Sequence, residues 1–264
     1  MSSSGRWGDL AVRIGSAAIL ILIGFGAVVT GGLVFHLLVA LCVGLMVWEL
    51  ARILDPQARA AAVQLAVLAT IAVGTAIYLP ANFAFPILIA PALVGISQLS
   101  QNKWLFAAYM AAITLAGFAM MSMRDGSGLV WMLWLMLVVI ATDVAGYFAG
   151  KAFGGPKFMP RISPKKTWSG TSAGWAAAAV VGSGFMIQLG AGIGLVLVSV
   201  AVSFAAQLGD IAESAIKRYA GVKDASALIP GHGGLMDRFD GLMAAALFVL
   251  LTAQLTGYPP VRID

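Results

Sequence analysis

Charged residues gather in one stretch of the chain, between Gly209 and Gly241, with long apolar runs on both sides. This stretch is about an eighth of the 264 residues, yet it holds nine of the 27 charged side chains, which comprise 16 basic and 11 acidic residues. Asp210, Glu213 and Lys217 are spaced three and four residues apart at its start. If the preceding helix continues this far, all three side chains share one face.

A second pair of acids, Asp237 and Asp240, lies at the start of the next apolar run. Two pairs of carboxylates at the ends of adjacent membrane spans indicate a divalent-cation site, because oxygen ligands suit Mg²⁺. The alternative is a solvated network in which the acids pair with Lys217, Arg218 and Arg238. Spacing alone leaves both open. The candidate metal ligands are Asp210, Asp237, Glu213 and Asp240.

Asp143 lies inside another apolar run, about two turns from its end. An ionisable group at that depth in a membrane span is a candidate functional residue. The alternative is a structural partner for a lysine or a backbone group. Gly146 and Gly150 are spaced as a small-residue pair and predict close helix packing.

The polar loop 151–168 contains Ser163 and the adjacent lysines Lys165 and Lys166, which suit phosphate groups. Their alternative role is a topology signal for membrane insertion. His232 lies among glycines in a turn and could contact phosphate or satisfy the loop. Gly154, Gly155, Gly231, Gly233 and Gly234 would let backbone amides approach an anion.

The composition identifies the elements that must position these residues. The chain is 61% hydrophobic and 10% charged, with a mean hydropathy of +0.95, whereas soluble domains are about 25% charged. We therefore predict an all-α, polytopic integral membrane protein, with N-terminal helices over 1–127 and a catalytic region over 128–264 that carries loops 150–169 and 209–236. The predicted spans are 14–30, 32–51, 60–79, 82–98, 103–122, 128–149, 170–188, 190–208 and 237–257.

Nine spans place 14 of the 16 basic residues on the side of the N-terminus, and only Arg124 and Arg262 on the other side. The positive-inside rule then predicts that the N-terminus and the charged loops are cytoplasmic. The first span lacks a convincing cleavage site and is expected to be retained. The single cysteine, Cys42, lies in an apolar run and is expected to be a buried apolar residue. Nucleic acid binding is not expected, because the basic residues lie in loops without a soluble module.

The charged stretch also matches a long pattern, S-x-x-K-R-x4-K-D-x7-H-G-G-x-x-D-R-x-D, which starts at Ser214 and ends at Asp240. It resembles the signature of phosphatidate cytidylyltransferases, also called CDP-diacylglycerol synthases. The segment SPKKTW at 163–168 and the pair Asp143 and Tyr147 resemble that family too, in the expected order. The resemblance covers the C-terminal half, and the N-terminal half matches only as apolar spans. In one departure, Ser169 stands where the resemblance leads us to expect Glu.

The resemblance implies that CTP and phosphatidate give CDP-diacylglycerol and pyrophosphate with Mg²⁺, and more weakly that K⁺ lies near the Mg²⁺. It also implies a homodimer in a bacterial-type inner membrane, with the metal held by the acids that match Asp210 and Asp237. The residues expected in catalysis are Asp210, Asp237, Lys217 and Arg218. The residues expected to bind substrate are Asp143, Ser163, Lys165, Lys166, Lys223, His232, Gly233, Gly234 and Arg238.

Three other functions compete with this interpretation. A CTP-dependent lipid kinase would share the carboxylates and the nucleotide site, but it would need a base for a hydroxyl group. A transporter would carry charges deeper in the membrane and on both halves of the path. A CDP-alcohol phosphotransferase is disfavoured because its D-G-x2-A-R…G-x3-D-x3-D pattern is absent from the sequence.

Overall fold

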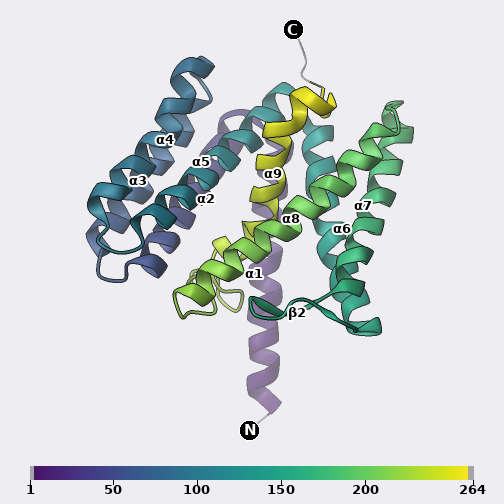
Figure 1. Ribbon diagram of the computed structural model, residues 1–264, viewed down its shortest axis with the longest axis horizontal. Helices are drawn as coiled ribbons and strands as arrows, with labels where there is room; N and C mark the ends of the chain where they lie inside the picture. The colour runs from purple at the N-terminus through teal and green to yellow at the C-terminus, as the bar shows by residue number, and fades with distance from the viewer. Residues whose placement is uncertain (1–2, 261–264) are drawn as a thin grey trace. The chain divides into compact units, whose positions relative to one another are not determined.

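The computed structural model describes residues 3–260, with side chains described over 15–253 and 255–260. Arg262, which contributes to the predicted charge asymmetry, lies outside these residues. Nine helices form in the part of the chain that is described (Figure 1). They are α1 (Ser3–Thr30), α2 (Gly32–Leu54), α3 (Arg59–Ala76), α4 (Ala81–Gln98), α5 (Lys103–Gly126), α6 (Leu129–Phe153), α7 (Trp168–Leu189), α8 (Gly194–Tyr219) and α9 (Met236–Thr256).

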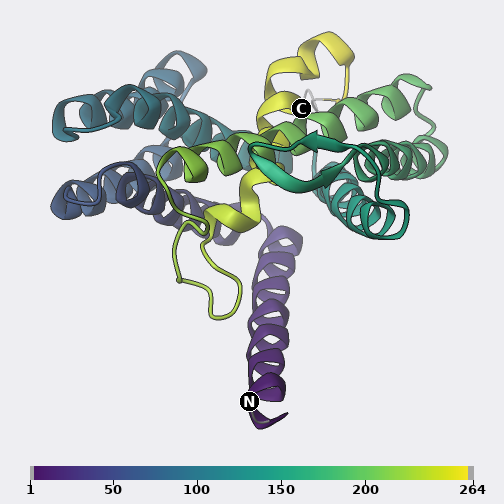
Figure 2. The same ribbon diagram turned by 60° about the horizontal axis from the view of Figure 1, so that its bottom comes forward.

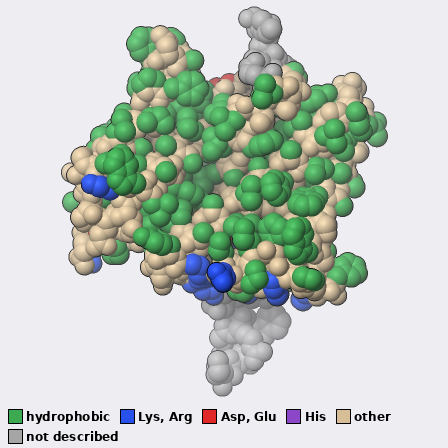
Figure 3. Space-filling model, in the orientation of Figure 1, with side chains coloured by type: hydrophobic (Ala, Val, Ile, Leu, Met, Phe, Trp, Pro, Cys, Tyr) green, Lys and Arg blue, Asp and Glu red, His purple; other side chains and the backbone are tan. Residues whose placement is uncertain are grey.

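Seven of these helices, α2 to α8, are long and apolar enough to cross a membrane, counted over the described residues. The apolar part of α1 within that count is shorter, Gly15–Thr30. The helix order follows the predicted spans, so the prediction of an all-α polytopic membrane protein is confirmed. Large hydrophobic side chains stay exposed on the helix faces, for example Ile187, which is 77% exposed, and Leu197, which is 67% exposed. Hydrophobic side chains dominate the face in Figure 3, as expected for surfaces that contact lipid.

One helix boundary follows directly from backbone chemistry, and another lies further along the chain than predicted. The break between α1 and α2 falls at Gly31, which has a φ of 66°, a conformation that glycine adopts readily. Helix α8 runs on to Tyr219, well past the predicted span end at 208. The expectation that Asp210, Glu213 and Lys217 occupy one continuing helix is therefore confirmed.

Packing divides the chain into two compact units. The first unit comprises the chain up to Met121 together with Ala220–Arg238, and the second comprises Ser122–Tyr219 together with the chain from Phe239 onward. The loop between α8 and α9 thus packs with the N-terminal helices.

Small residues bring α6 and α7 of the second unit close together. A Cβ atom added at Gly170 would lie 2.6 Å from the carbonyl oxygen of Gly146, and one at Gly150 would lie 3.0 Å from Thr167 Oγ1. The predicted packing role of Gly146 and Gly150 is confirmed. Helix α8 is joined to α6 by buried polar pairs, because the Trp134 indole donates to Ser199 Oγ at 2.9 Å.

The polar loop after α6 is not irregular, because it forms an antiparallel hairpin of β1 (Lys157–Met159) and β2 (Ser163–Thr167). Strand β2 contacts α7 and α8 (Figure 2). The hairpin ends where α7 begins: Thr167 is the N-cap, and its hydroxyl accepts a hydrogen bond from the Gly170 amide at 3.2 Å. Strand β2 is thereby held against the helices that carry the acids.

Candidate active site

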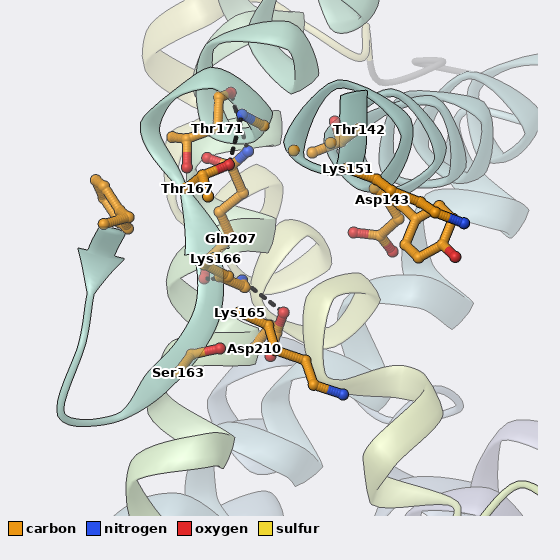
Figure 4. A pocket seen from close by; sticks show the side chains of 15 residues that line it. Thr142, Asp143, Lys151, Ser163, Lys165, Lys166, Thr167, Thr171, Gln207 and Asp210 are labelled. Carbon is orange, nitrogen blue, oxygen red and sulfur yellow. Dashed lines mark hydrogen bonds and ion pairs between the residues drawn. The ribbon is translucent and has the colours of Figure 1, made fainter. Parts of the chain in front are cut away.

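A pocket of about 420 Å³ opens in the second unit, between α6, β2, α7 and α8 (Figure 4). It is lined by polar side chains from all four elements together with Gly146, Gly150 and Gly170. Sequence segments separated by about 70 residues therefore meet in one cavity. The predicted site residues that line it are Asp143, Ser163, Lys165, Lys166 and Asp210.

The central contact of this pocket is an ion pair between β2 and α8. Lys166 Nζ lies 2.5 Å from Asp210 Oδ2, and it also lies 3.4 Å from the carbonyl oxygen of Gln207. The side chains of Lys166 and Asp210 are 23% and 35% exposed, so water still reaches both. Ser214 Oγ donates to the other carboxylate oxygen of Asp210 at 3.3 Å. The ammonium group is thus held beside an acid at an accessible cavity.

Asp210 is one of three acids within electrostatic range of one another, the others being Asp143 on α6 and Asp240 on α9. Lys166 offsets part of their repulsion. Over residues 15–253 and 255–260, no three His, Cys, Asp or Glu side chains converge closely enough to form a complete metal site by themselves. Mg²⁺ commonly takes one or two protein carboxylates and completes its shell with water and substrate phosphates. The carboxylates of Asp210, Asp143 and Asp240 are compatible with such a partly protein-coordinated Mg²⁺.

The polar scaffold behind the pocket was not predicted from the sequence. Gln207 Oε1 accepts a hydrogen bond from the Trp175 indole at 3.0 Å, and Gln207 Nε2 donates to the Thr171 carbonyl at 3.2 Å. Thr142 Oγ1 donates to Ser203 Oγ at 2.7 Å. The available signal was the presence of a glutamine and hydroxyl groups within apolar spans, where such groups need partners.

Glu213 and Lys217, both predicted site residues, lie on α8 and form an ion pair of 2.5 Å. The side chain of Glu213 is 1% exposed and that of Lys217 is 11% exposed, and neither lines the pocket. Their pairing agrees with the alternative of an acid–base network, although this pair is buried rather than solvated. Arg218, at the end of α8, is exposed.

In the first unit, the loop between α8 and α9 folds around Asp237. Its Oδ2 atom accepts hydrogen bonds from the backbone amides of Ala225, at 2.9 Å, and Gly234, at 2.7 Å. Gly233 has a φ of 86°, and a Cβ atom there would lie 2.9 Å from the same oxygen. Gly233 therefore lets the turn close on Asp237, and the amide of Gly234 binds the same oxygen. Lys223, at the start of this loop, is exposed.

His232 and Arg238 interact with each other across the same turn. The Arg238 guanidinium donates to the His232 carbonyl from Nε at 3.1 Å and from Nη2 at 2.6 Å. The His232 ring, through Nδ1, lies 2.9 Å from Ser16 Oγ on α1. His36, expected to be a packed or partnered residue, is buried, with its Nδ1 atom 2.8 Å from the Tyr78 hydroxyl, which confirms that expectation.

Ser169, which departs from the expected Glu, has a structural contact. Its hydroxyl donates to the Gly154 carbonyl at 2.5 Å and lies 3.0 Å from Thr167 Oγ1. Gly154 caps the end of α6. Ser169 therefore joins the start of α7 to the end of α6, at the base of the hairpin.

Comparison with known proteins reveals several relatives that share one name. A phosphatidate cytidylyltransferase of Brucella suis is 43% identical over 159 residues, which cover 57% of this chain and 58% of the relative. Those of Mycobacterium bovis and Haemophilus influenzae are each 41% identical, over 134 and 128 residues, which cover 49% and 46% of this chain and 43% and 44% of the relatives. Each match thus spans less than two thirds of the relative. A family model, described as the cytidylyltransferase family, matches residues 11–256. The chain therefore belongs to the cytidylyltransferase family.

Proposed function

We propose that this chain is a phosphatidate cytidylyltransferase, which transfers CMP from CTP to phosphatidate and releases pyrophosphate. The observation that carries the proposal is the half-buried pairing of Lys166 with Asp210 in a pocket that Lys165 and Asp143 also line. Cations and acids together suit a reaction in which two phosphate groups must approach each other. Family membership and the names of the relatives support the same activity.

The reaction requires little from the protein beyond positioning. A phosphate oxygen of phosphatidate attacks the α-phosphorus of CTP, and the bond from that phosphorus to the oxygen bridging to the β-phosphate breaks. Pyrophosphate leaves with that electron pair. The lipid phosphate is already anionic near neutral pH, so the step needs no strong general base. Lys165 and Lys166 would hold the phosphates and lower their mutual repulsion, which is the main task in such transfers.

Carboxylates of the second unit would hold Mg²⁺, with Asp210 as the first ligand and Asp143 or Asp240 beside it. When bound, the ion offsets phosphate charge and stabilises the leaving pyrophosphate. The resemblance pairs Asp210 with Asp237, and Glu213 and Asp240 complete the predicted set. Asp237 belongs to the other unit, so that pairing stays a prediction, as does a K⁺ ion near the Mg²⁺.

We also propose how the protein is oriented in the membrane and that it forms a homodimer. The charge asymmetry of the sequence supports a cytoplasmic N-terminus and cytoplasmic charged loops. In that orientation CTP enters from water while the acyl chains of phosphatidate stay in the bilayer. A bacterial-type inner membrane and a homodimer are part of the proposal through the family resemblance.

The test uses the full chain, purified in detergent or reconstituted in lipid. We expect pyrophosphate release and a labelled lipid product from CTP labelled at the α-phosphorus only when CTP, phosphatidate and Mg²⁺ are all present. Omission of each component in turn provides the controls. Transfer of the terminal phosphate of CTP to a polyprenol, without pyrophosphate release, would replace the proposal with a lipid kinase. No turnover of either kind in bilayers of several compositions would refute it.

A further inference from the structure

Glu49 is a fully buried acid in the middle of the N-terminal half, outside every motif that indicated function. It lies near the end of α2, and its exposed fraction is 0%. An acid in a membrane-spanning helix is unfavourable unless its oxygens find donors. The donors come from a segment more than 170 residues further along the chain.

Three hydrogen bonds join Glu49 to the loop between α8 and α9. Ser226 Oγ donates to Glu49 Oε1 at 2.5 Å, and the Leu235 amide donates to the same oxygen at 2.8 Å. The Met236 amide donates to Oε2 at 2.7 Å. Met236 is the first residue of α9, so Glu49 supplies acceptors to the amides at the start of that helix.

The loop is shaped to receive this carboxyl group. A Cβ atom added at Gly234 would lie 2.6 Å from Glu49 Oε1 and 2.8 Å from Ala225 Cβ, so no larger residue fits there without displacement. The amide of Gly234 at the same time donates to Asp237 Oδ2 at 2.7 Å. Gly234 therefore lies between the two acids, with its α-carbon close to one and its amide bonded to the other.

We propose that Glu49 is a positioning residue for Asp237. It fixes the two residues that precede Asp237, and through Ser226 it fixes the segment whose Ala225 amide also binds Asp237. The orientation of the Asp237 carboxylate is thus set from α2. Glu49 itself acts through this segment and not through contact with substrate.

The first experiment measures hydrogen exchange by mass spectrometry on the full chain in lipid nanodiscs. Glu49→Gln keeps the shape but places an amide group opposite one of the backbone donors. We expect exchange to rise at least about tenfold in peptides covering 224–236 and to stay unchanged in the hairpin 157–167. Tyr78→Phe, which removes a different polar contact to α2, is the matched control and leaves both regions as in wild type.

The second experiment measures steady-state kinetics and rests on the proposed cytidylyltransferase activity. Mutations behind a metal- or phosphate-binding carboxylate commonly cost about 10–100-fold in activity or metal affinity. We expect Glu49→Gln to lower kcat by that amount and to raise the Mg²⁺ concentration for half activation, with KM for phosphatidate unchanged. Gly234→Ala disturbs the same contact from the loop, because the added Cβ atom would lie 2.6 Å from Glu49 Oε1. It should give the same changes in kcat and in Mg²⁺ dependence.

The outcomes separate the inference from the proposed function. Inactive wild-type protein with the expected exchange pattern would reject the function and keep the role of Glu49. Exchange that rises throughout the first unit, with a fall in the thermal unfolding midpoint, would reduce Glu49 to a general stabilising residue and overturn the inference. Wild-type exchange and wild-type Mg²⁺ dependence in both Glu49→Gln and Gly234→Ala would overturn it as well.

Discussion

Replacement of Lys166 by methionine tests whether the charge of Lys166 contributes more to kcat than to the stability of the fold. The pair with Asp210 is partly exposed, at 23% and 35% for the two side chains, and ion pairs of that kind stabilise proteins by about 0.2–1 kcal/mol. For a chain of this size that loss shifts the unfolding midpoint by less than about 4 °C. Methionine keeps most of the apolar stem, so packing changes little.

The catalytic effect should be much larger, because the charge that develops during phosphoryl transfer is what a fixed cation stabilises. Loss of one well-placed group of this kind costs about 2.7–4 kcal/mol, or about 10²–10³-fold in kcat. We therefore expect Lys166→Met to retain its fold and to lose at least about 100-fold in kcat. The assay is pyrophosphate release at saturating CTP and Mg²⁺, alongside thermal unfolding of the same preparation.

Lys157→Met is the matched control for Lys166→Met. Lys157 is an exposed lysine of the same hairpin, on β1, and it does not line the pocket. We expect its kcat to stay within about threefold of wild type, the effect of about 0.7 kcal/mol on the barrier. A Lys166→Met enzyme that is equally active, or a Lys157→Met enzyme that is equally impaired, would refute the argument.

Three further predictions concern other parts of the chain. Asp237→Asn should fold and lose nearly all turnover, and wild-type rates would remove Asp237 from the predicted metal ligands. Trp134→Phe removes the donor to Ser199 and part of a buried ring, so the free energy of unfolding should fall by about 1–3 kcal/mol in detergent titrations. Burial raises the pKa of Asp55, but hydrogen bonds from Ser100 and Gln101 outweigh it and hold that pKa below its ordinary value. Ionised Asp55 therefore stabilises the fold above about pH 4 and loses this effect as pH falls through the lowered pKa. The thermal unfolding midpoint of Asp55→Asn should lie below that of wild type near neutral pH, and this difference should shrink in acid. A difference that does not change with pH would contradict the prediction.

The helices were predictable because length, apolarity and glycine placement are local properties. The span 82–98 contains Pro86 and Pro91, yet a helix forms there from Ala81 to Gln98. Membrane helices tolerate proline because neighbouring groups and local adjustments satisfy the backbone groups that it frees. The hairpin 157–167 was expected only as a polar loop, because its strands are three and five residues long and carry no alternating apolar pattern.

The candidate site was predictable in its residue types but not in its grouping. Asp143 and Asp210 were singled out by charge within or beside an apolar run, and Lys166 as one of two adjacent lysines in a polar loop. The structure brings all three to one pocket. The division of the acids between the two units depends on tertiary packing, which no local spacing reports. Glu49 was missed although a single acid in an apolar span was a usable signal.

The contact between Glu49 and its loop has a consequence for biosynthesis. Glu49 leaves the ribosome 177 residues before Ser226 and 187 before Met236. At elongation rates of about 5–20 residues per second, Glu49 is synthesised about 10–40 seconds before the residues that donate hydrogen bonds to it. During that interval the nascent membrane domain carries an acid whose native partners do not yet exist. Residues 214–240, which carry the signature motif, are thus made well after the helix whose Glu49 contacts them.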